Sequence, residues 1–387
     1  MFIAKIENIM IRREIQELIE SKLFKGKLII IYGARQVGKT TLIKEIGNKF
    51  PAERVYLNCD EPDIREQLTE ATSTKLKNLI GQKTLILIDE AQRVKNIGIT
   101  LKLFADEIKN VQVIATGSSS FELANEINEP LTGRKIQYFL YPLSLRELSS
   151  NFGFIETNRL IEERIIFGMY PEIVLNPGEK KNLIKEITRS YLFKDILNYE
   201  GIRKPELLEK LLVAIAAQIG NEVSYNELAG TVGLDKDTIN KYLDILEKAF
   251  IIFRLPPFSR NIRTEITKMK KIYFYDTGIR NTLISNHNQL SGRNDTGALW
   301  ENYMIVERMK MNSSLSIDPK CYFWRTSQQQ EIDYIEELYG NLNVYEFTFN
   351  EKKKKQISRT FINAYNVHNI SIVNKENYGK FLGIGND

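Results

Sequence analysis

The sequence contains only two cysteines and two histidines among its 387 residues. Cys59 and Cys321 lie far apart, and neither has a partner at the spacing of a disulfide framework or a zinc site. With only His287 and His368 as histidines, a site that needs several imidazole ligands is disfavoured too. Two isolated thiols are typical of a reducing compartment, so we expect a cytoplasmic protein.

Long apolar runs are also missing. The longest, LILI at 85–88 and LLVAIAA at 211–217, fall far short of the ~20 residues that a membrane span requires. Residues 1–15 carry charges from the fifth position on and show no apolar core of a signal peptide. The net charge of +5 is a small excess, which permits nucleic-acid binding without requiring it. We therefore expect no membrane partner.

What the sequence does contain is the alternation typical of an α/β protein. A chain of 387 residues exceeds the ~250–300 residues of a single core, so two or three domains are expected. In the first third, continuous apolar runs alternate with helical patterns, which predicts a largely parallel, buried sheet. The expected strands are residues 27–32, 54–59, 84–89, 111–116 and 135–143.

The remaining two thirds have a different pattern. Residues 144–220 read as helical, and 206–275 read as three helices followed by a hairpin, the order of a winged helix-turn-helix. From about residue 297, one helix and three strand-like runs indicate a separate α/β or α+β domain. We place the predicted domains at residues 1–145, 146–275 and 276–387.

A glycine-rich loop follows the first expected strand and precedes a helix. It reads Gly33-Ala34-Arg35-Gln36-Val37-Gly38-Lys39-Thr40 and matches G-x-x-x-x-G-K-[ST] in the context that this phosphate-binding motif needs. Its amides and the helix dipole attract phosphate, Lys39 adds a point charge, and the Thr40 hydroxyl can bind magnesium. We predict ATP and magnesium as cofactors. The residues expected to bind nucleotide are Gly33, Ala34, Arg35, Gln36, Val37, Gly38, Lys39, Thr40 and Thr41.

Further candidates lie near the ends of later strands. The third strand runs into Asp89, expected to hold magnesium through water, and Glu90, expected to activate the attacking water. Ser118 follows the fourth strand as a γ-phosphate sensor or part of a polar turn. Arg134 is a candidate to offset transition-state charge, within its own subunit or across a subunit interface, or else a surface arginine.

These motifs resemble a known family. IRREI, YGARQVGKTTL, LILIDEAQ, ATGSSS and LTGRKIQYFLYPLSLREL resemble the AAA-type ATPase domain that occurs with a C-terminal DUF4143 domain. GMYPEIV, IYFYDTGIRN, GALWENYMIVE and YFWRTSQQQEIDYI continue the resemblance in the same order over nearly the whole chain. It implies a fold with a P-loop NTPase parallel-sheet domain, a helical and winged-helix middle part, and an α/β C-terminal domain similar to PD-(D/E)XK nucleases.

The resemblance also maps a nuclease-like metal site onto Glu301, Asp333 and Glu346. This sequence departs from the pattern because Thr348 stands where a lysine is expected, although lysines 352–355 follow closely. Three alternatives stay open: an active nuclease, an inactive fold that binds DNA or a protein, and acids with a structural role.

Two functions follow from these features. The first is a magnesium-dependent ATPase that couples its nucleotide state to a winged helix bound to double-stranded DNA or a protein, with oligomerisation an open expectation. The second is an ATP-switched binding module with little turnover. The winged helix could instead be a rigid spacer. Its candidate DNA contacts are Lys236, Asn240, Lys241, Arg254, Arg260 and Arg263.

Overall fold

The computed structural model describes residues 10–117, 131–191, 202, 204–260, 269–351 and 355–385. The chain divides into two compact units. The N-terminal unit comprises Arg12–Leu143 with Lys248–Phe250, and the C-terminal unit is built mainly from Ser144–Glu247 and Ile251–Asp387. Most of residues 146–275 thus shares a unit with 276–387, while the three-part division made from the sequence stays a prediction.

The N-terminal unit is built on a five-stranded parallel sheet with the order β2-β3-β4-β1-β5. This confirms the parallel sheet that the apolar runs predict. The central strands are buried along their whole length, as expected for strands covered on both faces. β5 ends before residue 143, close to Pro142, which has no N–H for a ladder hydrogen bond. The strands are β1 (Leu28–Tyr32), β2 (Arg54–Asn58), β3 (Leu85–Asp89), β4 (Gln112–Gly117) and β5 (Lys135–Phe139).

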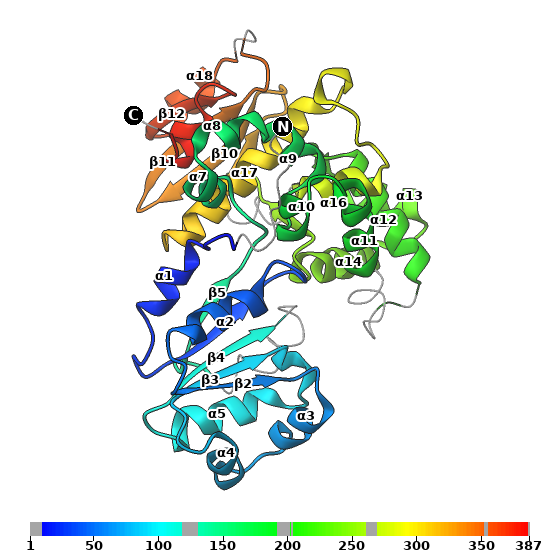
Figure 1. Cartoon of the computed structure of the whole chain (residues 1–387). Coiled ribbons are helices and arrows are strands. Elements are labelled where there is room, and N and C mark those ends of the chain that lie inside the picture. The colour runs from blue at the N-terminus through cyan, green and yellow to red at the C-terminus, as the bar shows by residue number, and fades with distance from the viewer. Residues whose placement is uncertain are drawn as a thin grey trace. The chain divides into compact units, whose positions relative to one another are not determined.

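Helices cover both faces of this sheet. Figure 1 shows α2 (Lys39–Asn48) on one face and α5 (Ile97–Glu107) on the other. α2 buries Leu42, Ile43 and Ile46, which recur on one side of a 3.6-residue period. Because all five strands run parallel, their carboxyl ends meet at one edge of the sheet, where α/β sheets bind ligands. The other helices are α1 (Ile15–Glu20), α3 (Pro62–Leu68), α4 (Ser73–Ile80) and the 3₁₀ turn η1 (Ala91–Arg93).

The C-terminal unit begins with a run of short helices. A capping box starts the first of them, because Ser144 and Glu147 satisfy each other's backbone N–H groups. Three short strands, β6 (Glu222–Val223), β7 (Ile252–Leu255) and β8 (Lys270–Phe274), form an antiparallel sheet in the order β6-β8-β7. The helices are α7 (Leu145–Phe152), α8 (Phe154–Arg159), α9 (Ile161–Phe167), α10 (Pro171–Leu175), α11 (Lys180–Tyr191), α12 (Pro205–Ala217), α13 (Tyr225–Val232), α14 (Lys236–Lys248) and α16 (Thr277–Leu283).

A four-stranded sheet with the order β12-β11-β10-β9 completes this unit. β9 to β11 are antiparallel, and β12 runs parallel to β11. α17 packs against this sheet and buries Trp300 completely. The elements are α17 (Thr296–Ser314), β9 (Lys320–Arg325), β10 (Glu331–Leu338), β11 (Asn341–Phe347), α18 (Arg359–Ala364), β12 (Val367–Val373) and α19 (Tyr378–Leu382).

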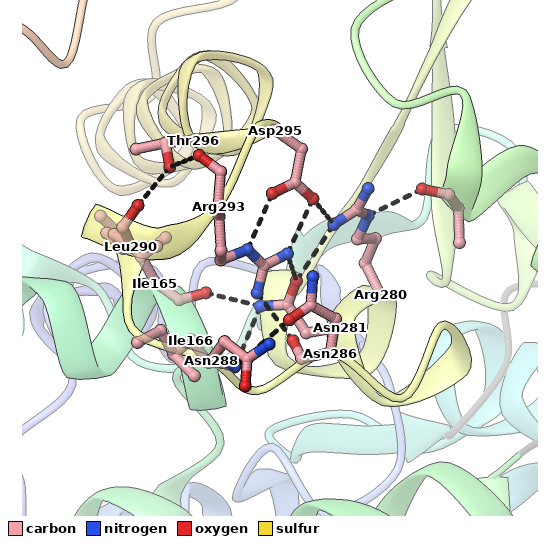
Figure 2. Close-up of polar contacts among 11 residues, drawn as sticks. Ile165, Ile166, Arg280, Asn281, Asn286, Asn288, Leu290, Arg293, Asp295 and Thr296 are labelled. Atoms are coloured by element: carbon pink, nitrogen blue, oxygen red, sulfur yellow. Dashed lines mark hydrogen bonds and ion pairs between the residues drawn. The ribbon is translucent and has the colours of Figure 1, made fainter.

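A buried ionic network fixes α16 to the segment that leads into α17 (Figure 2). Arg280 and Arg293 both pair with the carboxylate of Asp295. Burial alone would raise the pKa of Asp295, but hydrogen bonds from the two guanidinium groups lower it to about 2. Asn281 extends the network by donating to the carbonyl oxygens of Ile165 and Ile166 at the end of α9. The hydrogen bonds and ion pairs of this network join parts of the fold to one another, so we interpret it as structural.

Candidate functional site

The loop between β1 and α2 requires glycine at two positions. A Cβ atom on Gly33 would lie 2.2 Å from the carbonyl oxygen of Leu140, so no larger residue fits. Gly38 has a φ of 97°, a left-handed conformation that favours glycine, and Gln36 adopts a φ of 62° despite its side chain. The result is a tight turn that delivers the chain to the N-terminus of a ten-residue helix, where backbone N–H groups and the helix dipole attract an anion.

Two basic side chains brace this loop. Lys39 is buried and donates to the carbonyl oxygens of Gly33 (3.0 Å) and Ala34 (2.8 Å), so its ammonium group lies across the loop itself. Arg13 is buried too and donates to the carbonyl oxygens of Val37 (2.7 Å) and Tyr141 (2.6 Å). The sequence reasoning assigned no role to Arg13, whose only signal was its place in the IRREI stretch.

Asp89 lies at the carboxyl end of β3 and accepts hydrogen bonds from three hydroxyl groups. Thr40 and Tyr56 donate to Oδ2, each at 2.7 Å, and Thr116 donates to Oδ1 at 2.5 Å. The structure thus brings Thr40 and Asp89 together, as the two motifs predict. Tyr56 was missed as a site residue, because a tyrosine in an apolar strand has no distinct signal.

Glu90 follows in a left-handed conformation, with a φ of 52°. Its N–H donates to the Thr116 hydroxyl at 3.1 Å, and its carboxylate accepts a hydrogen bond from Gln92 Nε2 at 2.6 Å. A strained backbone held by neighbouring hydrogen bonds is a common feature of functional sites. Glu90 therefore lies directly beside the Thr40–Asp89 pair, with its carboxylate held by Gln92.

Arg134 lies elsewhere. The register pairs Leu28 with Lys135 and Tyr32 with Phe139, so the residue before Lys135 lies at the amino-terminal edge of the sheet. A five-residue strand spans ~16 Å, and the P-loop begins at its other end. Arg134 instead pairs with Asp106 at 2.6 Å. Arg134 thus lies at the sheet edge opposite the P-loop of its own subunit, and a catalytic role for it stays a prediction. Ser118 lies outside the described residues.

Three family descriptions match the chain. Residues 25–149 match an AAA domain, and residues 296–381 match DUF4143, a domain of unknown function. The chain thus contains an AAA domain and, after it, a DUF4143 domain. Residues 158–290, between the two, match another domain of unknown function, DUF8612. The family resemblance stated from the sequence motifs is confirmed.

Similar proteins occur in bacteria and archaea. An uncharacterized protein of Mycobacterium tuberculosis is 27% identical over 358 residues, which cover 91% of this chain and 77% of the relative. One of Methanocaldococcus jannaschii is 27% identical over 338 residues, which cover 82% and 74%. The solved Walker-type ATPase of Pyrococcus abyssi is 16% identical with a TM-score of 0.50, over 72% of this chain and 97% of that one. This last similarity shows the fold alone.

The C-terminal unit contains a second cluster of charged residues. Lys271 on β8, whose side chain is only 1% exposed, pairs with Glu301 of α17 (3.0 Å) and with Glu331 of β10 (2.5 Å). Tyr273 donates to the same Glu301 carboxylate at 2.5 Å. Burial raises the pKa of Glu301 to about 7, although Lys271 lowers it in part. Lys271 thus ties the short β6-β8-β7 sheet to the DUF4143 domain.

Lys355 holds the other two acids of this cluster. Its ammonium group lies 2.5 Å from Asp333 Oδ2 and 2.8 Å from Glu346 Oε2. The backbone N–H of Phe347 also donates to Asp333, at 2.8 Å. Burial and the neighbouring Asp333 raise the pKa of Glu346 to about 8, and Lys355 opposes this rise. Both carboxyl groups therefore share the one ammonium group of Lys355.

Glu301, Asp333 and Glu346 do not fit the metal site that the resemblance implies. Within the described ranges, no group of three or more His, Cys, Asp or Glu residues is placed to hold a metal ion. The acids are instead engaged by lysines: Lys271 pairs with Glu301, and Lys355 pairs with Asp333 and Glu346. Thr348 donates to the carbonyl oxygen of Asn350 and contributes no charge, while Lys355 enters from the lysine run nearby.

Some of the predicted DNA contacts are exposed, and others are engaged within the fold. Lys236, Asn240 and Lys241 are exposed on α14. Arg254 is instead engaged by Glu247 and by Asp244 at 2.6 Å, and its side chain is only 14% exposed. Its expected phosphate contact is therefore not supported.

Two further findings concern DNA and membranes. Arg260 is exposed but lies against Phe258 and 3.5 Å from Glu337, and Arg263 is outside the described residues. Among the helices that the structure describes, none is long and apolar enough to cross a bilayer.

Proposed function

We propose that this chain is a magnesium-dependent ATPase whose site is formed by the P-loop, Asp89 and Glu90. The observation that carries the proposal is the 2.7 Å hydrogen bond from Thr40 to Asp89, which joins the phosphate-binding loop to the acid expected beside the metal. The donors fit a nucleotide with magnesium: a loop of N–H groups, a lysine, a hydroxyl and a carboxylate. Magnesium, when bound with ATP, neutralises charge on the β- and γ-phosphates.

Each residue has a defined task in this proposal. Lys39 leaves the carbonyl oxygens of Gly33 and Ala34 to reach the phosphates. Thr40 commits its hydrogen to Asp89, so the lone pairs of its oxygen stay available for a cation. Glu90 orients the attacking water. ATP in preference to GTP rests on the family resemblance alone.

The test is phosphate release by the full chain with ATP and magnesium. We expect Lys39→Ala and Glu90→Gln each to lower turnover at least ~100-fold, because each removes a group that acts on developing charge or on the nucleophile. Glu90→Gln should still bind nucleotide. Lys49→Ala, at the exposed end of the same helix, is the matched control and should keep its turnover. Wild-type turnover in Lys39→Ala would contradict the proposal.

A second candidate is an ATP-switched binding module with little turnover. It is favoured by the hydrogen bond from Gln92 to Glu90, which occupies the carboxylate that has to orient water. Ligand at a hundredfold over its dissociation constant stabilises a folded protein by ~2.7 kcal/mol. A clear thermal shift with ATP and magnesium, without phosphate release even when duplex DNA is added, would favour this candidate over the first.

The C-terminal unit supports a narrower proposal. The order α12–β6–α13–α14–β7–β8 supports a winged helix, and the order α17–β9–β10–β11–α18–β12 supports a nuclease-like fold. Because Lys271 and Lys355 occupy oxygens of its acids, we propose that this fold is not an active metal-dependent nuclease. Asp237 and Asp244 on α14 oppose its lysines, so we favour a protein partner over duplex DNA. The free cysteines support a cytoplasmic protein.

A further inference from the structure

Tyr56 contacts Asp89 and, like Thr116, lies outside both motifs of the nucleotide site. It lies on β2, next to β3, where the register pairs Asn58 with Asp89. Its hydroxyl donates to Asp89 Oδ2 at 2.7 Å, the same oxygen that accepts from Thr40. The hydroxyl can hold the Asp89 carboxylate only if the tyrosine ring that carries it is itself held in place.

The ring is held by the helix that carries the P-loop threonine. Lys44 Nζ lies 4.5 Å from the centroid of the Tyr56 ring. Lys44 follows Thr40 by four residues, so the two side chains share one face of α2. Tyr56 therefore contacts α2 through its ring and β3 through its hydroxyl, and so connects the two halves of the proposed site.

The hydrogen bonds to Asp89 determine how its carboxylate is turned. Thr116 holds Oδ1, while Thr40 and Tyr56 hold Oδ2. Without the Tyr56 hydroxyl, Oδ2 would depend on Thr40 alone, whose own oxygen is needed for the cation. A carboxylate that acts beside a metal ion needs such support, and loss of supporting hydrogen bonds typically lowers metal affinity by ~10–100-fold.

We propose that Tyr56 is a positioning residue for magnesium: its hydroxyl fixes the Asp89 carboxylate in the orientation that the magnesium–nucleotide complex requires. This inference rests on the proposed function, because it assumes that the P-loop binds nucleotide with magnesium. It predicts that loss of the hydroxyl lowers the affinity for magnesium and leaves nucleotide binding without metal unchanged.

The experiment measures binding of a fluorescent ATP analogue to the full chain, first in EDTA and then during a magnesium titration. Tyr56→Phe keeps the ring and the Lys44 contact and loses only the hydroxyl. We expect its magnesium midpoint to rise ~10-fold or more, with affinity in EDTA within about twofold of wild type. Tyr138→Phe removes a hydroxyl from a buried tyrosine of β5 in the same sheet and should leave the midpoint unchanged.

A third variant separates the hydroxyl from the ring. Lys44→Gln removes the charge over the ring and leaves the hydroxyl, so it should shift the midpoint less than Tyr56→Phe. A Tyr56→Phe midpoint equal to wild type, or a Lys44→Gln shift as large as that of Tyr56→Phe, would overturn the inference while the proposed function stands. Wild-type protein that binds the analogue without any effect of magnesium would instead overturn the proposed function.

Discussion

The two charged sites of this chain use opposite means to hold a buried carboxylate. Asp89 in the N-terminal unit accepts from the neutral hydroxyls of Thr40, Tyr56 and Thr116. Asp333 and Glu346 in the C-terminal unit share the ammonium group of Lys355. Hydroxyl donors orient a carboxylate and leave its negative charge in place, whereas an ammonium group cancels that charge. The first site therefore keeps its charge for a cation, whereas the two acids of the second site share one ammonium group.

The C-terminal unit also contains a buried lysine. Lys271 is almost completely enclosed between Glu301 and Glu331, and its pKa is raised well above the usual value by these acids despite the opposing effect of burial. Buried ion pairs of this kind fix an arrangement more than they add stability, and removing one partner is strongly destabilising. We infer that the lysines of the C-terminal unit hold its sheets together, while the hydroxyls of the N-terminal unit prepare a ligand site.

The largest effect should come from breaking the second arrangement. Lys271→Met keeps the length of the side chain and removes its charge, which leaves Glu301 and Glu331 without their shared cation. We expect a loss of about 3 kcal/mol or more in the free energy of unfolding, measured by urea denaturation. Lys320→Met, at an exposed position of β9, is the control and should change stability by less than about 0.5 kcal/mol. A stability equal to wild type in Lys271→Met would show that this pair has no structural role.

The contrast also explains which features could be predicted from the sequence. The P-loop is a contiguous run whose residues act through local backbone geometry, and Asp89 ends an apolar strand, so both have local signals. Tyr56 reaches Asp89 across 33 residues, and Lys271 reaches Glu301 across 30, and both pairings depend on packing between elements. No local pattern distinguishes such a tyrosine or lysine from its neighbours.

The position of Arg134 could have been predicted from the sequence alone. Arg134 immediately precedes the fifth strand, and in a parallel sheet the residue before a strand lies at the amino-terminal edge. The P-loop follows the first strand and so lies at the opposite edge. The direction of the strands thus already argued against a role for Arg134 in its own subunit, whereas the pairing of Lys355 with Asp333 and Glu346 required the structure.

A smaller effect should sharpen the comparison through pH. Because the pKa of Glu346 is raised from 4.5 to about 8, the folded protein holds a proton between these values that the unfolded chain has lost. This contribution to stability is complete below pH 4.5 and is lost as the pH rises through about 8. Glu346→Gln keeps the shape and cannot ionise, so its melting temperature relative to wild type should increase from pH 5 to pH 9.

The control for this pH series is Glu351→Gln, an exposed position close in sequence. Its difference from wild type should stay constant over the same range. If the difference between Glu346→Gln and wild type stays constant as well, Glu346 is already ionised at neutral pH, and the cluster carries a net negative charge. The cluster would then keep a negative charge, as the Asp89 site does, despite its contacts with Lys355.

The smallest effect is expected at Arg134, which lies at the sheet edge opposite the P-loop. Its ion pair with Asp106 is largely exposed, with 41% and 32% of the two side chains accessible, and such pairs contribute about 0–1 kcal/mol. Arg134→Ala should therefore change stability little and leave ATP turnover within about twofold of wild type at low protein concentration. An arginine that acts across a subunit interface would instead be worth ~10³-fold or more in rate. Turnover per chain that rises with concentration in wild type, and not in Arg134→Ala, would show that the phosphate site of one chain is completed by the opposite sheet edge of another.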